Sequence, residues 1–395
     1  MNGRRIGGLA LCIVLGLFAS AAVYSLAGHA SDTTNLNRHV AKTGSDINPD
    51  DCTNPAFPCR TVQRAVDVAG DEDVIKVAAG VYTDVNSYGG LSQVVYLTKT
   101  LTLRGGYTTT DWTTADPVAN PTTLDAEGQG RVLYVTGPIS PTIEGLRMTG
   151  GDASGMGGAS TGSDAGGGVY VTQAAPTISN CVVYSNTASA AGQAYGGGLY
   201  LYQSAAILSS NIITGNRAGT STAGNGFGGG LYLDYSDDAM LSDNLVEGNT
   251  ASTASHGHGG GVYLLWSDAT LDGNTILGNV GSKAMTSTGG GLVVRLSAAT
   301  LTGNMILSNT AAITDRGYGG GVALSVSPAT LTGNTVRGNI ASAANTGEGG
   351  GLYIIVSEAT LNDNTIAANV ANTGQTSRGE GGGLSVLQDL SLIHI

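Results

Sequence analysis

Residues 259–279 read GGGVYLLWSDATLDGNTILGN, and residues 289–309 read GGGLVVRLSAATLTGNMILSN. The two segments carry glycine, leucine and asparagine at matching places, thirty residues apart. Eight glycine triplets recur in this way, at spacings of 30 to 32 residues, and their last glycines run from Gly168 to Gly383. A period of this length is typical of a solenoid, in which each repeat is one coil stacked on the next.

Each repeat carries the alternation of a short strand directly after its glycine triplet. The first and third places are aliphatic, as in Val262 and Leu264, so alternate residues are expected to face in and out. Further apolar marks recur in register at Leu271 and Ile276, and no helical periodicity accompanies them. The sequence therefore predicts an all-β parallel β-helix with coils of about 30 residues and two or three short strands in each coil.

Asparagines form two columns at the same period. We interpret both columns as structural ladders, because an Asn amide can bond to the same amide one coil away and Asn tolerates left-handed turns. The first column is Asn211, Asn244, Asn274, Asn304, Asn334 and Asn364, with Cys181 in place of Asn in the first repeat. The second column is Asn186, Asn216, Asn249, Asn279, Asn309, Asn339 and Asn369.

The segment before the regular repeats begins with a helical pattern. In PCRTVQRAVDVAG (58–70), Val62, Ala65, Val66 and Ala69 have helical spacing, and DVIKVAAGVYTDV (73–85) then alternates as a strand. We expect a short N-terminal capping helix that shields the open edge of the first coil, because an open edge invites the addition of a strand.

Two groups of motifs resemble known families. The run PCRTVQRAV (58–66), DVIKVAAGVYTD (73–84) and LTLRGGY (101–107) resembles the opening of secreted right-handed β-helix proteins of the pectin-lyase-like class. The pairing of Ile276–Asn279 with Gly289–Leu292 is similar to the repeats of polymorphic outer-membrane, adhesin-type proteins. The resemblance implies a right-handed β-helix, in agreement with the usual hand of parallel crossovers. It implies no single activity, because the fold hosts lyases, hydrolases and non-catalytic fibres.

The two ends of the chain are read separately from the coils. Arg4 and Arg5, an apolar run and a small-residue cleavage pattern at Gly28 and Ala30 predict a signal peptide over 1–30, with an uncleaved membrane anchor as the alternative. The last residues, LSLIHI (390–395), match one reading frame of a sequencing-adaptor DNA, so we interpret them as a non-native tail and expect the natural chain to continue after Asp389. Between these ends we expect the cap and irregular first coils at 31–165 and the regular coils at 166–389.

Cysteine usage and net charge restrict the compartment and the partners. Cys52 and Cys59 are close enough in DCTNPAFPCR (51–60) for a short disulfide-closed loop in an oxidising compartment. The formal charge is −12 and the 17 Lys and Arg residues are scattered, so nucleic acid is not expected as a partner. Acidic polymers would also be repelled unless cations bridged them.

One acidic corner is the candidate for chemistry. Asp234, Asp237 and Asp238 lie in the repeat with an extra residue, and we expect Asp268 to stack next to Asp238. Such a cluster could hold Ca²⁺, with solvated corner residues as the alternative. The same Asp pair and the His258 segment imitate two motifs of polygalacturonases, but they are expected at opposite ends of neighbouring strands, too far apart for one glycosidic bond.

Tyrosines recur at the second place after the triplets. Tyr170, Tyr200, Tyr232 and Tyr263 should face outward on successive coils, with Trp266 near the same face. Such a strip either binds sugar rings by stacking or consists of rings that stack on each other and are covered by loops. The Ser-, Thr-, Gly- and Ala-rich segments before each triplet are either a variable contact edge or spacer.

We therefore expect an exported, monomeric β-helix rod at the cell surface or outside the cell, with a structural or adhesive role and no evident catalytic site. Its expected partners are an extracellular polysaccharide or another cell surface, with membrane contact only through the N-terminal segment or a C-terminal anchor beyond this sequence. The alternative is a polysaccharide lyase or glycoside hydrolase with its site at the Asp234–Asp268 corner or in a missing C-terminal part. No cofactor is expected other than the Ca²⁺ considered at that corner.

Overall fold

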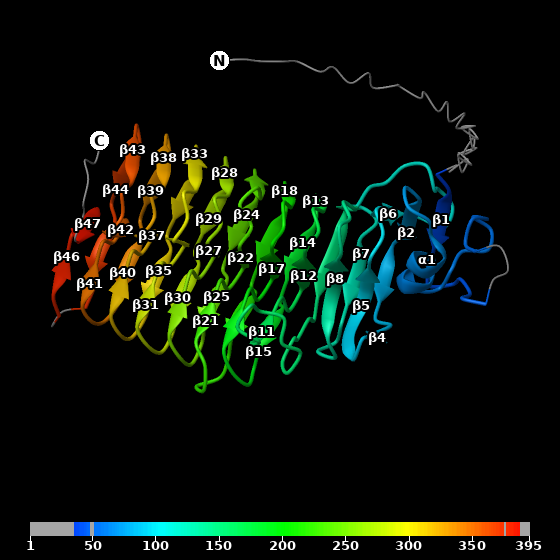
Figure 1. Ribbon diagram of the computed structural model, residues 1–395, viewed down its shortest axis with the longest axis horizontal. Coiled ribbons are helices and arrows are strands. Elements are labelled where there is room, and N and C mark those ends of the chain that lie inside the picture. Colours follow the sequence, from blue (N-terminus) through cyan, green and yellow to red (C-terminus); the bar gives the residue numbers. More distant parts are fainter. Residues whose placement is uncertain (1–34, 48–50, 375–376, 388–395) are drawn as a thin grey trace, which may run out of the picture. The chain divides into compact units, whose positions relative to one another are not determined.

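Short parallel strands recur in every coil and align into five sheets in the computed structural model, which describes residues 35–47, 51–374 and 377–387 (Figure 1). The expected signal segment and the expected non-native tail lie outside these residues. Each strand after the first coils pairs with its equivalents in the preceding and following coils. The strands β4 and β5 pair antiparallel near the start of the described chain, and an isolated antiparallel bridge joins Gly158 to Asp164.

We number the sheets in the order in which the chain passes through them after a glycine triplet. Sheet 1 contains β4 (Asn86–Tyr88), β5 (Leu91–Leu97), β8 (Arg131–Thr136), β12 (Val169–Thr172), β17 (Leu199–Tyr202), β22 (Leu231–Asp234), β27 (Val262–Leu265), β32 (Leu292–Arg295), β37 (Val322–Ser325), β42 (Leu352–Ile355) and β47 (Leu384–Leu387). Sheet 2 contains β1 (Asn37–Val40), β2 (Val74–Ala78), β6 (Thr102–Tyr107), β9 (Thr142–Glu144), β13 (Thr177–Ser179), β18 (Ile207–Ser209), β23 (Met240–Ser242), β28 (Thr270–Asp272), β33 (Thr300–Thr302), β38 (Thr330–Thr332) and β43 (Thr360–Asn362). Sheet 3 contains β3 (Gly80–Tyr82), β7 (Thr122–Asp125), β10 (Leu146–Thr149), β14 (Val182–Tyr184), β19 (Ile212–Thr214), β24 (Leu245–Glu247), β29 (Thr275–Leu277), β34 (Met305–Leu307), β39 (Thr335–Arg337) and β44 (Thr365–Ala367).

Sheets 4 and 5 are built from shorter strands and begin later in the chain. Sheet 4 contains β15 (Thr187–Ser189), β20 (Arg217–Gly219), β25 (Thr250–Ser252), β30 (Val280–Ser282), β35 (Thr310–Ala312), β40 (Ile340–Ser342) and β45 (Val370–Asn372). Sheet 5 contains β11 (Asp164–Ala165), β16 (Ala194–Tyr195), β21 (Gly226–Phe227), β26 (Gly257–His258), β31 (Ser287–Thr288), β36 (Gly317–Tyr318), β41 (Gly347–Glu348) and β46 (Gly379–Glu380).

The register between coils follows the sequence period. Leu271 pairs with Leu301, and Leu301 with Leu331, so equivalent side chains stand directly over one another. The inward residues Val262 and Leu264 belong with them to one continuous core of buried aliphatic side chains. The predicted parallel β-helix with coils of about 30 residues is therefore confirmed.

Each regular coil contains five short strands, so the expectation of two or three was too low. The additional strands belong to sheets 4 and 5 and come from the Ser-, Thr-, Gly- and Ala-rich segments, for which a variable contact edge and spacer were the two interpretations. Pairing between coils uses backbone groups, so it needs no apolar alternation, and small residues such as Ala251 are fully buried there. Composition alone could not distinguish this paired backbone from a loop.

Both asparagine columns form continuous amide ladders. The Nδ2 of Asn279 donates to Oδ1 of Asn309 at 3.0 Å and to the carbonyl of Val246 at 2.9 Å, and the backbone N–H of Asn279 donates to the same Oδ1 at 2.9 Å. The same three bonds recur along the column, so each amide joins three coils. Cys181 begins the other column, and its backbone N–H donates to Oδ1 of Asn211 at 3.0 Å.

The left-handed turn falls on the residue before each ladder asparagine and not on the asparagine. Gly278, with φ of 63°, precedes Asn279, and Gly273, with φ of 64°, precedes Asn274. The tolerance of Asn for left-handed turns is therefore not what places it in the columns. Their amides are instead held in line by the bonds to the coils on either side.

The last glycine of each triplet packs on the second asparagine ladder. A Cβ at Gly261 would lie 2.8 Å from the carbonyl oxygen of Gly291 and 3.0 Å from Nδ2 of Asn279. The first glycine, Gly259, has φ of 64° and makes the turn. The triplet and the Asn column, separate marks in the sequence, are therefore one contact in space.

A serine ladder, which the sequence analysis did not single out, follows sheet 1. The backbone N–H of Ser236 donates to Oγ of Ser267 at 3.0 Å, and that of Ser267 donates to Oγ of Ser297 at 2.9 Å. These hydroxyls satisfy buried N–H groups at the corner between sheets 1 and 2. A Ser six places after the last glycine of six of the eight triplets was the available signal.

The expected short helix is present as α1 (Val62–Val68). Thr61 caps it by accepting a hydrogen bond from the N–H of Arg64, and Val62, Ala65 and Val66 join the main core. Its amide side chain at Gln63 exchanges two hydrogen bonds with the backbone of Tyr96 in β5. The predicted disulfide between Cys52 and Cys59 is also confirmed. In the described part of the chain, no helix is long and apolar enough to cross a membrane.

Candidate functional site

The second-place tyrosines of sheet 1 form a continuous stack. Ring centroids are 5.5 Å apart between Tyr170 and Tyr200, 5.5 Å between Tyr200 and Tyr232, and 5.0 Å between Tyr232 and Tyr263, with interplanar angles of 10° to 16°. None of the four residues is more than 5% exposed. They point away from the main core, as expected, and of the two alternatives the structure has the rings stacked on each other and covered, so these four tyrosines do not form an exposed sugar-binding face.

Sheet 5 is the physical reason for this burial. Its strands bring a second row of rings against the tyrosines, as where Tyr195 meets Tyr232 edge-on at 5.1 Å and Phe227 meets Tyr263 edge-on at 5.7 Å. The tyrosines and these rings form a second apolar cluster outside the main core. The ring faces between successive tyrosines from Tyr170 to Tyr263 are therefore occupied by protein side chains.

A loop between β10 and β11 also crosses the tyrosine stack and is fastened to Asp234. The Oγ of Ser160 and the hydroxyl of Tyr200 each donate to Oδ2 of Asp234 at 2.7 Å. The Tyr170 hydroxyl donates to the carbonyl of Gly158 in the same loop at 2.7 Å. Burial raises the pKa of the Asp234 carboxyl, and the two hydrogen bonds to it act in the opposite direction.

The acidic corner does not converge as a group of four. Asp234 is 1% exposed and bonded inward, whereas Asp237, Asp238 and Asp268 are exposed. The backbone N–H of Asp268 donates to Oδ1 of Asp237 at 3.2 Å, so Asp268 lies against Asp237. The expectation that Asp268 stacks next to Asp238 was wrong. The reason is register, because Asp238 lies in the stretch that holds the extra residue of its coil.

The described residues contain no group of three or more His, Cys, Asp or Glu side chains that could hold a metal ion. The structure thus does not bring the four predicted ligands together around one point. His258 is also separate from this corner, because it lies in sheet 5 and stacks on Phe227 with ring centroids 5.1 Å apart. Burial lowers the pKa of His258 to about 4.

Exposed aromatic rings gather at the corner between sheets 1 and 2. Trp266 is 42% exposed and Tyr235 is 43% exposed, and their rings stack with centroids 4.8 Å apart at 19°. Tyr202 contacts Tyr235 edge-on at 6.3 Å. Of the five aromatic residues proposed from the sequence as sugar-binding, Trp266 is therefore the one at the surface.

These two rings belong to a column that we call the corner strip. It occupies one place in seven successive coils, and every member has a positive φ, from 44° to 55°. Its members are Gln173, Gln203, Tyr235, Trp266, Leu296, Val326 and Val356. All except the half-buried Leu296 are exposed, so the strip runs from amides through aromatic rings to aliphatic side chains. The column leaves no mark in the sequence, because its members share a backbone conformation and not a residue type.

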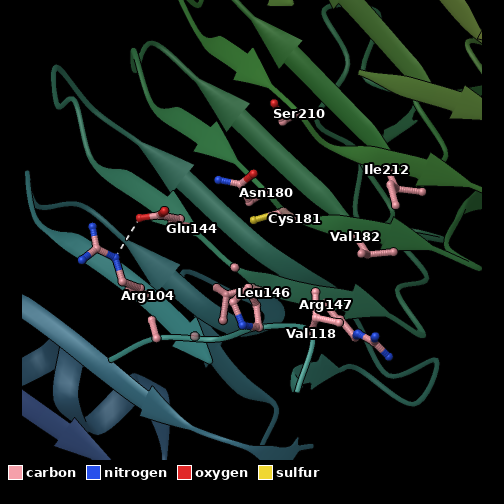
Figure 2. A pocket seen from close by; sticks show the side chains of 14 residues that line it. Arg104, Val118, Glu144, Leu146, Arg147, Asn180, Cys181, Val182, Ser210 and Ile212 are labelled. Carbon is pink, nitrogen blue, oxygen red and sulfur yellow. Dashed lines mark hydrogen bonds and ion pairs between the residues drawn. The ribbon is translucent and has the colours of Figure 1, made fainter. Parts of the chain in front are cut away.

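A pocket of about 450 Å³ lies at the corner between sheets 2 and 3 (Figure 2). Arg104 and Glu144 form an ion pair of 2.7 Å at one side, and Leu146, Val182 and Ile212 provide apolar wall. The free thiol of Cys181 also lines the pocket, and burial raises the pKa of this thiol to about 12. A thiol that stays protonated is a poor nucleophile. Apart from the replacement of Asn by Cys181, no sequence signal pointed to this pocket.

The lining of this pocket lacks a paired acid and base. Its 14 lining residues include one carboxylate, Glu144, whose partner is the guanidinium of Arg104, and no histidine. Arg147 is exposed at the rim. The arrangement can bind a small molecule, but it does not offer the two carboxylates that glycoside hydrolysis requires.

Comparison with known proteins gives one match to a family model. The model described as a right-handed β-helix region matches residues 159–389. A search of curated protein sequences finds no match.

Comparison with solved structures gives matches of low sequence identity and low TM-score. A rhamnogalacturonan lyase is 11% identical with a TM-score of 0.34, and the alignment covers 91% of this chain and 89% of that one. The pectate lyase Pel9A is 12% identical with a TM-score of 0.34, covering 91% and 79% of the two chains. The A-module of the mannuronan C-5 epimerase AlgE4 of Azotobacter vinelandii is 14% identical with a TM-score of 0.32, covering 82% and 94%. Identities this low carry no information about activity.

Proposed function

Because the chain belongs to the right-handed β-helix family, we propose that it is a non-catalytic structural rod that adheres to neutral polysaccharide outside the cell. The corner strip is the contact surface in this proposal. Polysaccharide is held along successive coils, which are spaced by about 4.8 Å, and no bond in it is cleaved.

The observation that carries the proposal is the exposure of Tyr235 and Trp266 within one aligned column. Exposed Tyr and Trp present an apolar body and a polar tip, which suits the mixed C–H and hydroxyl surface of a sugar. Gln203 precedes them in the same column and adds an amide that both donates and accepts hydrogen bonds. A row of such groups favours an extended chain over a single small ligand.

Charge favours a neutral polysaccharide over an acidic one. The chain has a formal charge of −12, and the carboxylates of Asp237 and Asp268 are exposed two residues after Tyr235 and Trp266. Both carboxylates would repel a polyanion but can accept hydrogen bonds from sugar hydroxyls.

The state of the candidate groups supports a role without turnover. Asp234 is directed inward to Tyr200 and Ser160, and the Cys181 thiol is held protonated. Hydrolysis by two carboxyl groups requires both to flank one glycosidic bond. The alternative, a lyase or hydrolase at the Asp234–Asp268 corner, is an outcome of the experiment below.

The Cys52–Cys59 disulfide supports an extracellular role. It suits an oxidising compartment, in agreement with the export signal expected at 1–30.

We also propose that α1 protects the first coils from strand addition. The Gln63 amide supports this role, because its two bonds occupy the backbone N–H and C=O of Tyr96 in β5.

Co-sedimentation with insoluble neutral and acidic polysaccharides tests the proposal. Wild-type protein should sediment with a neutral polymer, and Tyr235→Gln with Trp266→Gln should reduce the bound fraction by roughly tenfold, the effect of about 1.4 kcal/mol. Glutamine is chosen because the column already accepts it at Gln173 and Gln203. Met305→Gln, which replaces an exposed side chain of sheet 3, is the matched control and should bind as the wild type does.

Two results would overturn the proposal. One is equal binding by the wild type and the double variant. The other is the release of new reducing ends or unsaturated products, with or without Ca²⁺, that disappears in Asp237→Ala, which would make the chain an enzyme.

A further inference from the structure

The tyrosine stack of sheet 1 is interrupted for two coils. Tyr263 pairs in register with Val293, Val293 with Ala323, and Ala323 with Tyr353. All four side chains point to the same outer side of the sheet and belong to the second apolar cluster. Two rings that the column would otherwise contain are therefore replaced by small side chains.

The row of rings on sheet 5 is interrupted at the neighbouring level. His258 stacks on Phe227, then Thr288 follows in register, and the next ring is Tyr318. Tyr318 packs against Tyr353 with ring centroids 5.2 Å apart, so the aromatic contact resumes beyond the gap. The two interruptions face each other across sheets 1 and 5.

A hollow of about 150 Å³ occupies this gap, and we call it the ring slot. It is lined by Phe227, His258, Tyr263, Thr288, Val293, Arg295 and Ser325. An engineered apolar cavity of about 150 Å³ in another protein holds one benzene molecule. The ring slot therefore has room for one six-membered ring.

Its walls are arranged to receive a flat ring. Tyr263 has Tyr232 on one face at 5.0 Å, and its other face is directed to the coil of Val293, where a tyrosine would continue the stack. Phe227 lies edge-on to Tyr263. His258 and Val293 occupy the equivalent positions one coil further along, so His258 would lie edge-on to a ring above Val293. A ring above Val293 would thus meet one ring face and one ring edge, which are the two favoured aromatic contacts.

Arg295 is the one charged residue in the lining. It lies two residues after Val293 on β32, so both side chains point to the same side of the sheet, and Arg295 is exposed. Burial raises the pKa of the Tyr263 hydroxyl, and the nearby Arg295 opposes this shift. Arg295 forms no ion pair with a carboxylate in the described ranges. A guanidinium at the mouth of an aromatic hollow is suited to a planar carboxylate, which it can bind through two parallel hydrogen bonds.

We propose that the ring slot binds a small aromatic carboxylate, with the ring stacked on Tyr263 above Val293 and the carboxylate paired with Arg295. This site is separate from the corner strip and independent of polysaccharide adhesion. His258 stays uncharged at neutral pH because burial lowers its pKa to about 4, so it packs against the ring as a neutral imidazole. The slot admits one ring, so the ligand belongs to the benzoate class rather than to larger aromatic systems.

Isothermal titration of the full chain with benzoate, benzamide and glucuronate tests the site. Benzoate should bind with a dissociation constant of about 0.1–1 mM, the range expected for a ligand of this size. Benzamide lacks the charge, and glucuronate lacks the flat ring, so each should bind at least tenfold more weakly. Failure of benzoate to bind at about 20 mM, far above this expected range, or glucuronate binding as tightly as benzoate, would overturn the proposal.

Two variants locate the binding. Val293→Tyr should abolish it, because the new ring fills the slot in register with Tyr263, and the thermal midpoint shows whether the variant is folded. Arg295→Gln should weaken benzoate about tenfold and leave benzamide unchanged. Arg337→Gln, which removes an exposed arginine from sheet 3, is the matched control. Binding that survives Val293→Tyr in a folded protein would place the ligand elsewhere and refute the site.

Discussion

Ser160 and Asp234 are 74 positions apart in the sequence, and the Ser160 hydroxyl donates a hydrogen bond of 2.7 Å to the Asp234 carboxylate. The bond fastens the loop between β10 and β11 onto a strand that lies two coils beyond β12. Tyr200, in the coil between them, donates to the same oxygen. The other carboxylate oxygen, Oδ1, is buried and has no hydrogen-bond partner in the described structure.

We predict that Asp234 makes the protein less stable as the pH rises. Its pKa is raised above 3.8 in the folded state, so the folded chain binds the proton more tightly than the unfolded chain does. The stabilising contribution is complete below 3.8 and is lost as the pH rises through the folded pKa. Asp234→Asn cannot titrate, so its free energy of unfolding relative to the wild type should increase between about pH 3.5 and pH 7. Urea denaturation at both pH values measures this difference.

Ser160→Ala provides the opposing variant. It removes a hydrogen bond that lowers the pKa of Asp234, so the pH dependence should become steeper than in the wild type. Loss of a hydrogen bond to a charged group should cost about 1.5–3 kcal/mol at neutral pH. A difference between Asp234→Asn and the wild type that does not vary with pH would contradict the assignment.

The asparagine ladder should be most sensitive in its middle. Asn279→Ala removes the acceptor of two donors of Asn249 and the bond to the Val246 carbonyl, all fully enclosed. We expect a loss of about 3 kcal/mol in the free energy of unfolding, measured by chemical denaturation. Asn369→Ala, at a half-buried place near the end of the same ladder, should cost about 1 kcal/mol because water can replace the lost bonds. Equal losses at the two positions would argue against the ladder as the cause.

Cys181→Asn should extend the first ladder by one coil. The Cys181 Sγ lies 3.7 Å from the Ile143 carbonyl, and its backbone N–H already donates to Asn211 Oδ1. An amide at this position could donate to both acceptors, as Asn186 donates to Met148 and Asn216 in the other column. We expect a gain of about 1 kcal/mol in the free energy of unfolding, whereas Cys181→Ala should lose stability. A destabilised Cys181→Asn would mean that the pocket wall requires the smaller sulfur.

The sequence predicted the coils because stacking makes equivalent positions similar. Leu271 and Leu301 stand over one another, so the same core space selects the same residue every thirty positions. Asn279 and Asn309 repeat for the same reason, since each amide needs an identical partner. These features could be read from spacing alone.

The features that the sequence did not reveal depend on side-chain contacts between different sheets and on where an extra residue is absorbed. Tyr232 was expected to face outward, but nothing in its own strand indicates that Tyr195 of sheet 5 folds against it. Asp234 resembled its neighbour Asp237 in the sequence, but one is bonded inward and the other is exposed at a corner. A single extra residue in that coil decided which aspartate meets Asp268, and letter spacing does not show where such a residue is absorbed.

The ladder bonds between neighbouring coils point along the direction in which the coils are stacked. Tension applied along that direction would therefore load the bonds of all five sheets between two coils at the same time. These bonds would have to break together before a coil could unwind. Tension applied to a single end residue would instead open the sheets one strand after another. The same chain is thus mechanically stiff when it is gripped across a whole coil and yields in small steps when it is pulled by its terminus.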